Sequence, residues 1–373
     1  MTKKKTLYII YSEFFIYEQN KISIGGIQNY ILGLIEVFHI KYNIKIIQKS
    51  NQYFKKEFKD YTVQGFKIKK NHNLGKQLYN NIKSNLNDED YIIWASDRIA
   101  CKTNHNKTVS IQHGITFDFL DYENIKIGNI LKKSLLLSVT YRFFQYLSAI
   151  KFFLRSKTVV CVDYNFLNWI RTILPRSYTN RAVVIPNFTK IPNLNVQKDT
   201  TAINILFARR FVAYRGVFVL CEVVKAILSK YDNVNFGIYG EGVLNDYIKK
   251  ELGDFNNVTI SSFNFDEAID VSLNYDISIV PSLASEGTSL SLLESMACGC
   301  VPIASNIGGM TNILIDGFNG FLVNPTATDF VKKIEYLINN PDELLSLSKN
   351  ARETSEKSFS FRKWKMEWEQ VLK

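Results

Sequence analysis

The segment PSLASEGTSLSLLE (residues 281–294) carries two carboxylates, Glu286 and Glu294, eight positions apart around a predicted strand-to-helix turn. The run before it, residues 276–281, is short and apolar, as is typical of a buried parallel strand. The stretch from Ser285 to Thr288 supplies residues that cap a following helix. Because a helix start offers unpaired N–H groups and a positive dipole end, the segment predicts a site for an anionic ligand.

The two carboxylates indicate what else this ligand carries. A carboxylate only accepts hydrogen bonds, so Glu286 at the mouth of the turn suits the hydroxyl groups of a sugar. Glu294, two turns further on, suits a ribose diol, which is the role of an acidic residue in dinucleotide-binding folds. The segment therefore predicts a nucleotide-sugar site with its phosphates at the helix start.

Length and composition describe a globular protein. The chain has 373 residues, of which 46% are hydrophobic and 22% charged, and this length suits two domains that each bury a core. Its five cysteines are scattered without a metal-like spacing or a disulfide framework, which favours a reducing cytoplasm. Cys298 and Cys300 are expected to be small buried hydrophobic residues.

The net charge of +11 favours an acidic partner. No nucleic-acid-binding motif accompanies it, so a phosphorylated substrate and an anionic membrane surface are the better candidates. The segment 132–155 mixes aromatic and basic residues that suit a bilayer interface, although they suit a domain core as well. No run of 18 uncharged apolar residues occurs, so we expect no membrane-spanning helix.

Short apolar runs alternate with helical patterns along the whole chain, which predicts two doubly wound parallel sheets. One helix is expected at Gly26–Phe38, and the domain boundary is expected within 187–202. The predicted strands of the first series are 6–11, 44–48, 91–95, 109–112, 158–162 and 182–185, and those of the second are 203–208, 234–239, 258–261, 277–281 and 301–304.

The Glu-x7-Glu spacing, with Glu-Gly-Thr-Ser at 286–289 and Glu-Ser-Met-Ala-Cys-Gly-Cys-Val-Pro at 294–302, resembles the signature of the retaining glycosyltransferases called GT4. The resemblance implies the GT-B fold, an α/β architecture of two Rossmann-like domains facing a cleft. Residues 1–187 would form the acceptor domain and 188–357 the nucleotide-sugar domain. A C-terminal helix, 358–373, would cross back to the first domain.

The resemblance also implies which residues bind the diphosphate of the donor. In the segment ARRFVAYRG (208–216), Arg210 and Arg215 resemble the family's Arg and Lys and would neutralise the leaving diphosphate. The family has Gly where this chain has Arg209, and Lys where it has Arg215, so contacts to phosphate can be forked. With these two cations and the helix start in place, no metal is implied. The single Asp-x-Asp match, Asp88 to Asp90, is expected to be a solvated turn.

Further positions follow from the same likeness. Gly240 and Gly242 resemble the family's turn beside the nucleotide base, although a tight turn without ligand contact explains them equally well. Gly26 resembles the glycine loop after the first strand. His113, at the end of a strand, resembles the histidine that binds the donor sugar near the reacting carbon. Together with Glu286, the donor-binding segment would include Gly287, Thr288 and Ser289, of which the last two replace the family's commoner Phe-Gly.

The function implied is transfer of a sugar, with retention of configuration, from a nucleoside-diphosphate donor to a hydroxyl of a lipid-linked glycan. Glu286, His113, Arg210 and Arg215 would act at the reacting end. The acceptor would be an undecaprenyl-diphosphate-linked glycan of O-antigen or capsule synthesis, at the inner face of a bacterial inner membrane. A nucleotide-sugar 2-epimerase and a non-catalytic membrane-surface binder are the alternatives. The base, sugar, linkage and oligomeric state stay open.

Overall fold

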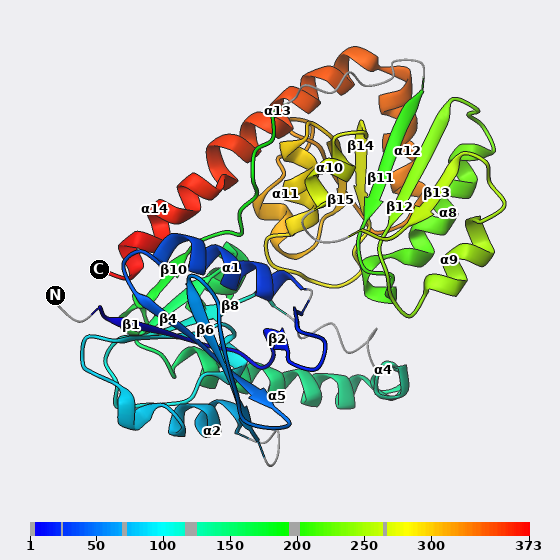
Figure 1. The fold of residues 1–373 in the computed structure, drawn as a ribbon. Helices are drawn as coiled ribbons and strands as arrows, with labels where there is room; N and C mark the ends of the chain where they lie inside the picture. The colour runs from blue at the N-terminus through cyan, green and yellow to red at the C-terminus, as the bar shows by residue number, and fades with distance from the viewer. Residues whose placement is uncertain (1–3, 24, 69–72, 116–124, 194–201, 264–266) are drawn as a thin grey trace. The chain divides into compact units, whose positions relative to one another are not determined.

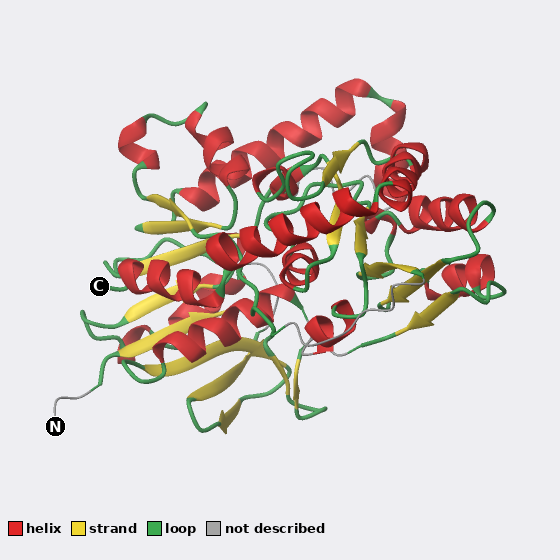
Figure 2. Cartoon of the chain, turned by 90° about the horizontal axis from the view of Figure 1, so that it is seen from above, coloured by secondary structure: helices red, strands yellow, loops and turns green. Residues whose placement is uncertain are grey.

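The computed structural model describes residues 4–23, 25–68, 73–115, 125–193, 202–263 and 267–373. These residues divide into two compact units. The first unit comprises Met1–His113, Thr140–Ile185 and Lys365–Lys373, and the second comprises Gly114–Val139 and Pro186–Trp364. Each unit is a sheet flanked by helices (Figure 2).

The first unit contains an eight-stranded sheet that is parallel except for one edge strand. Its order is β10 (Ala182–Val184), β9 (Thr158–Cys161), β8 (Thr108–Gln112), β7 (Tyr91–Trp94), β1 (Thr6–Ile10), β4 (Asn43–Ser50), β6 (Tyr61–Lys67) and antiparallel β5 (Phe54–Glu57). Helix α1 (Gly26–Phe38) lies on one side, and α2 (Leu74–Asn80) and α5 (Leu135–Phe153) lie on the other (Figure 1). Helices α6 (Tyr164–Arg171) and α7 (Arg176–Thr179) and the hairpin β2 (Phe15–Ile16) and β3 (Lys21–Ile22) complete the unit.

The second unit contains a six-stranded parallel sheet. Its order is β13 (Val258–Ser261), β12 (Val234–Tyr239), β11 (Ile203–Ala208), β14 (Ile277–Val280), β15 (Val301–Ser305) and β16 (Phe321–Val323). Counted along the chain this order is third, second, first, fourth, fifth and sixth, which is that of the Rossmann fold. Its helices are α4 (Ile125–Lys133), α8 (Val217–Leu228), α9 (Asn245–Leu252), α10 (Ala268–Ser272), α11 (Leu290–Ala297), α12 (Ala327–Asn339) and α13 (Pro341–Phe359).

The strands of the second sheet are apolar on both faces, because helices cover both. Ile205 and Phe207 on β11 pack with α8 and α12 in one core cluster. Leu206, between them in the sequence, packs with Tyr275 and Cys300 in another. This alternation explains why the three strands beginning at 203, 234 and 258 were predicted with their observed bounds.

The last helix differs from the prediction of one helix over 358–373. Helix α13 ends at Phe359, Ser360 pairs with Thr189 in an isolated bridge, and α14 (Phe361–Val371) follows. Within the second unit, the Trp364 ring lies 4.5 Å from that of Phe188. Within the first unit, Trp368 Nε1 donates to Tyr30 Oη at 2.9 Å. The two tryptophans are therefore buried in different units.

Five strands were missed by the sequence prediction: the two-residue strands β2 and β3, and β5, β6 and β16. Strand β5 reads FKKE and contains no apolar run, and β16 has only three residues. Strand β6 reads YTVQGFK, in which polar residues and a glycine interrupt the β-branched positions. Such edge and near-edge strands bury one face or little surface, so their sequence signal is weak.

Candidate functional site

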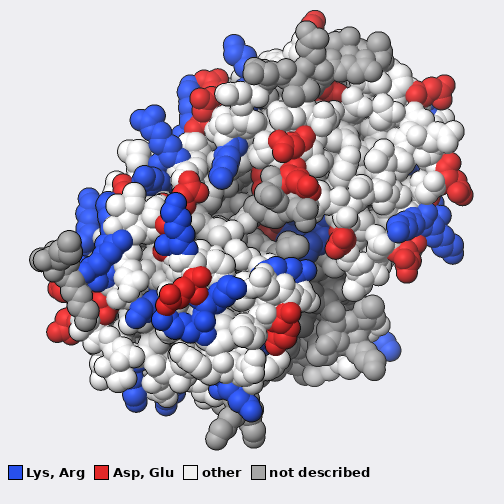
Figure 3. All heavy atoms as spheres, in the orientation of Figure 1, with Lys and Arg blue, Asp and Glu red and all other residues white. Residues whose placement is uncertain are grey.

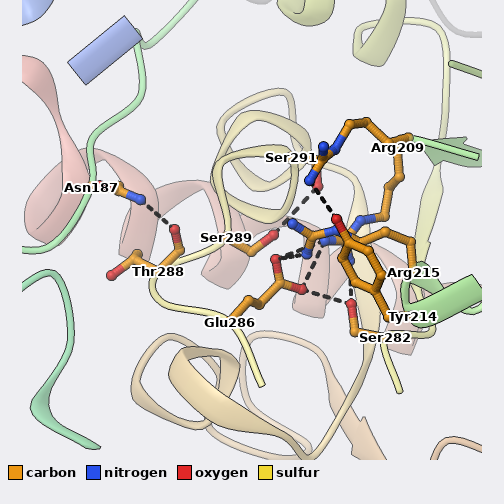
Figure 4. Close-up of polar contacts among 10 residues, drawn as sticks. Asn187, Arg209, Tyr214, Arg215, Ser282, Glu286, Thr288, Ser289 and Ser291 are labelled. Carbon is orange, nitrogen blue, oxygen red and sulfur yellow. Dashed lines mark hydrogen bonds and ion pairs between the residues drawn. The ribbon is translucent and has the colours of Figure 1, made fainter. Parts of the chain in front are cut away.

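The site lies where the order of the second sheet reverses. Strands β11 and β14 are neighbours but not consecutive in the chain, and in open α/β sheets ligands bind at the carboxyl ends of such strands. The loop after β11 carries Arg209, Arg210 and Arg215, and the loop after β14 carries Ser282 and Glu286 (Figure 4). The topology therefore gathers residues from two loops that lie 67 or more positions apart in the sequence.

Glu286 is the centre of this cluster. Arg209 Nη2 donates to both carboxylate oxygens, at 2.7 Å to Oε1 and 2.8 Å to Oε2. Ser282 Oγ donates to Oε1 at 2.7 Å, and Arg209 Nη1 donates to Ser282 Oγ at 2.9 Å. Arg215 Nη1 donates to Oε2. The Glu286 side chain is 9% exposed, so the carboxylate that the sequence placed at the mouth of the turn is buried by these partners.

The charge state of Glu286 follows from these partners. Burial alone would raise the pKa of its carboxyl, but the charges of Arg209 and Arg215 outweigh burial and hold the pKa at about 2. The carboxylate is therefore ionised at neutral pH, although it is almost excluded from water. A fixed negative charge of this kind can orient hydroxyl groups that donate to it.

Arg209 and Ser282 are the members of this cluster that the sequence prediction missed. Arg209 was treated only as a departure from the family's glycine, yet its side chain is 4% exposed and its Nη2 donates to both carboxylate oxygens of Glu286. Arg210, the neighbour that was assigned to the diphosphate, is exposed and donates to Tyr214 Oη. The signal in the sequence was the arginine itself, which stands at a position where the resembling family has glycine.

Arg210 and Arg215 flank one aromatic ring. Their guanidinium carbons lie 5.8 and 5.2 Å from the centre of the Tyr214 ring, within the range of a cation–π interaction. Arg215 closes the short helix 213–215, and Gly216 follows it with a φ of 82°. A side chain at Gly216 would contact the carbonyl of Pro281, so this glycine lets the two loops approach each other closely.

Helix α11 begins later than the sequence indicated. Its first residue is Leu290 and its N-cap is Ser289, which makes no side-chain capping hydrogen bond, so the capping predicted for Ser285 to Thr288 was wrong. Gly287, Thr288 and Ser289 are buried, and Asn187 Nδ2 donates to the carbonyl of Thr288 at 2.6 Å. The loop between Glu286 and α11 is therefore held by its neighbours.

Two glycines support the Glu286 loop from the next strand. Gly309 N donates to the carbonyl of Glu286 at 2.6 Å. A Cβ at Gly308, whose φ is 57°, would lie 2.5 Å from that same carbonyl oxygen, and one at Gly309 would lie 2.4 Å from Gly287 C. Only glycine allows this backbone contact, which explains the Gly-Gly pair after β15.

Gly240 and Gly242 allow a close approach between two backbone segments. A Cβ at Gly240 would lie 1.9 Å from the carbonyl oxygen of Arg209, and one at Gly242 would lie 2.4 Å from that of Phe211. Both glycines therefore bring the loop after β12 against the backbone that carries Arg209. They also line a surface hollow together with Asn245, Lys249, Ser261 and other residues of the second unit.

Glu294 lies on α11 and is half-buried. Burial raises the pKa of its carboxyl to about 7. Among the residues that the structure describes, no donor lies within hydrogen-bond distance of this carboxylate. An acceptor that is kept partly desolvated suits a diol of a ligand, which would replace the lost water.

Glu294→Gln is expected to stabilise the protein at high pH. The pKa of Glu294 rises from 4.5 in the unfolded chain to about 7 in the folded protein, so the folded state holds a proton that the unfolded chain has released. Wild-type stability therefore falls as pH rises from 4.5 to 7, whereas the variant lacks this contribution. Urea unfolding should show the variant more stable by about 3 kcal/mol at pH 8 and equal near pH 4. A difference that does not change with pH would contradict the assignment.

In the first unit, His113 follows β8 at the carboxyl edge of the sheet. His113 Nε2 lies 2.7 Å from the carbonyl oxygen of Ala95, which can only accept, so Nε2 carries the proton. Burial lowers the pKa of His113 to about 4, so the ring is neutral and its Nδ1 is an acceptor. The ring packs edge-on against Tyr30 at 5.7 Å, and Gly26 is the first residue of α1, the helix that carries Tyr30.

The expectation of a solvated turn at Asp88 to Asp90 was wrong for Asp90. Asp90 is 2% exposed, and its Oδ1 and Oδ2 accept from the backbone N–H groups of Thr6 and Asn87. Glu89 bridges Lys5 and Lys107. This Asp-x-Asp match therefore ties β1 to the start of β7. In the described ranges, no three His, Cys, Asp or Glu side chains are grouped as a metal ion would require.

A family model matches a large part of the second unit. Residues 193–354 match the family described as Glycosyl transferases group 1. Over 215 residues the chain is 32% identical to an uncharacterized glycosyltransferase of Methanocaldococcus jannaschii, a match that covers 56% of this chain and 57% of that protein. Over 182 residues it is 30% identical to the poly(ribitol-phosphate) alpha-N-acetylglucosaminyltransferase of Staphylococcus aureus, covering 47% and 36%. The chain thus spans about half, or less, of the length of these relatives.

The solved structure of HepE from Anabaena in complex with UDP-glucose superposes with a TM-score of 0.70 at 14% identity, covering 98% of this chain and 99% of that one. This likeness confirms the predicted architecture: the chain has the GT-B fold, with two Rossmann-like sheets. Within it, residues 193–354 are the part of the chain that is similar to the glycosyl transferases group 1.

Proposed function

We propose that the chain is a nucleotide-sugar-dependent glycosyltransferase that retains the configuration of the transferred sugar. The observation that carries this proposal is Glu286, a desolvated carboxylate held ionised by Arg209 and Arg215 at the switch point of a Rossmann sheet. A carboxylate beside two cations suits a ligand that presents hydroxyl groups and phosphates together. The family of residues 193–354 supports the same class of reaction.

The donor would lie along the carboxyl edge of the second sheet. Its diphosphate would bind Arg210, Arg215 and the N–H groups at the start of α11, and no metal would be needed. Its ribose would bind Glu294 and its base would occupy the hollow beside Gly240 and Gly242. HepE, which shares the fold, was solved with UDP-glucose, so UDP is the first nucleotide to test.

In the reaction, an acceptor hydroxyl oxygen would bond to the anomeric carbon as the bond from that carbon to the donor phosphate breaks. The leaving diphosphate would take the acceptor proton, and Arg210 and Arg215 would neutralise its growing charge. Glu286 would orient the sugar by accepting from its hydroxyls. His113, whose Nδ1 is an acceptor, would receive a hydrogen bond from a sugar hydroxyl near the reacting carbon.

A panel of UDP, GDP, dTDP, CMP and ADP, with and without magnesium, tests the donor site by thermal unfolding. One nucleoside diphosphate should raise the unfolding temperature selectively, and magnesium should not change the result. A ligand at a hundred times its Kd stabilises the folded state by about 2.7 kcal/mol. No response to any nucleotide would contradict the proposal, and donor turnover without an acceptor would favour the 2-epimerase.

The acceptor is proposed to be a lipid-linked glycan, of the undecaprenyl-diphosphate type used for O-antigen or capsule. A hollow at the carboxyl ends of β1 and β4 includes Glu13, Tyr17, Glu18 and Lys49, which can bind hydroxyl groups and a sugar face. The relative from Staphylococcus aureus acts, by its name, on poly(ribitol-phosphate), a polymeric acceptor. These observations favour a polymeric acceptor over a small one.

We also propose peripheral contact with an anionic membrane, at the cytoplasmic face of a bacterial inner membrane. Residues 124–162 contain Lys and Arg but no Asp or Glu, and Leu135, Leu136, Phe143 and Phe144 of this segment are 54–81% exposed. The face drawn in Figure 3 instead mixes both signs of charge. In the part of the chain that the structure describes, no helix has the length and apolarity to cross a bilayer. Co-flotation with anionic but not neutral liposomes is expected, and its absence would contradict this proposal.

A further inference from the structure

The carboxylate of Glu286 has no acceptor capacity left in this structure. A carboxylate offers about four lone-pair directions. Arg209 Nη2 and Ser282 Oγ use two on Oε1, and Arg209 Nη2 and Arg215 Nη1 use two on Oε2. A sugar hydroxyl can therefore bind Glu286 only after one of these partners has left.

The three partners differ in how firmly they are held. The Arg209 side chain is 4% exposed and also donates to Ser282 Oγ, and Ser282 itself is fully buried. The Arg215 side chain is 18% exposed and donates to one oxygen of Glu286, whereas Arg209 donates to both. Arg215 is thus the partner that can move with the least loss of buried contacts. Its guanidinium also has further donors that match phosphate oxygens.

We propose that the donor diphosphate draws Arg215 away from Glu286, and that this exchange opens Oε2 of Glu286 to a hydroxyl of the donor sugar. Arg209 and Ser282 stay in place throughout, so they act as positioning residues that keep the carboxylate fixed and charged. This inference rests on the proposed donor site. It makes recognition of the sugar conditional on the diphosphate, because a sugar without phosphates cannot displace the arginine.

The exchange has a consequence that a simple sugar-binding role for Glu286 does not have. In the wild-type protein a diphosphate competes with Glu286 for Arg215, so part of its binding free energy is used to break that ion pair. Glu286→Gln removes the competing charge and should bind a diphosphate more tightly, even though it cannot orient the sugar. Inorganic pyrophosphate is a suitable probe because it carries neither base nor sugar.

Removing Glu286 could raise pyrophosphate affinity in two ways: by freeing Arg215, or by removing a negative charge that repels the anion. A double-mutant cycle distinguishes the two effects. Pyrophosphate affinity is measured by calorimetry, at one ionic strength, for the wild type, Glu286→Gln, Arg215→Met and the double variant. Glu286→Gln should bind about tenfold more tightly than the wild type, the scale of one charged hydrogen bond. In the Arg215→Met background the same change should have almost no effect.

An equal gain in both backgrounds, or no gain in either, would overturn the exchange while leaving the donor site standing. Failure of the wild type to bind either pyrophosphate or any nucleoside diphosphate would overturn the proposed function as well. Thermal unfolding of each variant checks that it is folded. If Glu286→Gln does not fold, Glu286→Ala replaces it in the same cycle, because it removes the charge without placing an amide donor against the arginines.

Discussion

Glu286→Gln is expected to lower kcat for sugar transfer by about a hundredfold to a thousandfold, the range found when one orienting group at a reacting centre is removed. Glutamine has the size of glutamate, but its amide nitrogen is a donor that would face the donors of Arg209 and Arg215. The substituted side chain can accept through one oxygen only and carries no charge. Steady-state kinetics with the nucleotide-sugar selected by the panel measures the effect.

The control for this variant is Glu335→Gln. Glu335 pairs with Lys230 on the surface of the same unit, and exposed ion pairs contribute little. Its kcat should equal that of the wild type. If Glu286→Gln keeps wild-type kcat and KM while its fold is intact by circular dichroism, Glu286 does not orient the donor sugar. A loss of kcat together with tighter pyrophosphate binding would support both claims: that Glu286 orients the sugar, and that it exchanges Arg215 with the diphosphate.

The second large effect concerns stability. Arg209→Met should lower the free energy of unfolding by about 3–5 kcal/mol, because removing one partner of a buried ion pair leaves a desolvated charge behind. Arg210→Met, one residue further on, should cost less than about 1 kcal/mol, since Arg210 is exposed. Urea unfolding of the two variants at pH 7 makes this comparison between adjacent arginines. Similar losses of unfolding free energy in the two variants would contradict the claim that Arg209 forms a buried ion pair with Glu286.

The same pair predicts a pH dependence. The pKa of Glu286 is about 2 in the folded protein and 4.5 in its ordinary state, so its contribution to stability is complete above pH 4.5 and is lost as pH falls toward 2. Without Arg209 this contribution is smaller. The difference in stability between the wild type and Arg209→Met should therefore be largest near neutral pH and shrink below pH 4.5.

The sequence predicted the second sheet well because its strands are buried on both faces. Runs such as Ile203–Ala208 are short and mostly apolar. Such a run predicts a strand even when the neighbouring strands are unknown. Strands β5 and β16 carry too little apolar sequence to be distinguished from loops. The parallel arrangement of both sheets then follows from the two βα series, because parallel strands are joined by crossover helices.

The site was predictable only in part, since its decisive contacts join distant segments. The sequence indicated the Glu286 loop and the arginine-rich loop, but not which of Arg209 and Arg210 turns inward. That choice depends on Ser282 and Glu286, which lie more than 70 residues away. Asp90 illustrates the same limit, because its burial depends on Thr6, 84 positions earlier.

The measurement that tests the central claim most directly is a crystal structure of the chain with the nucleoside diphosphate that the thermal panel selects. The account predicts the diphosphate within hydrogen-bond distance of Arg215 and the N–H groups at the start of α11. Arg209 should still donate to both oxygens of Glu286, and Arg215 should have withdrawn from it. A diphosphate bound away from these residues would contradict the donor site. Arg215 still paired with Glu286 beside a bound diphosphate would contradict the exchange.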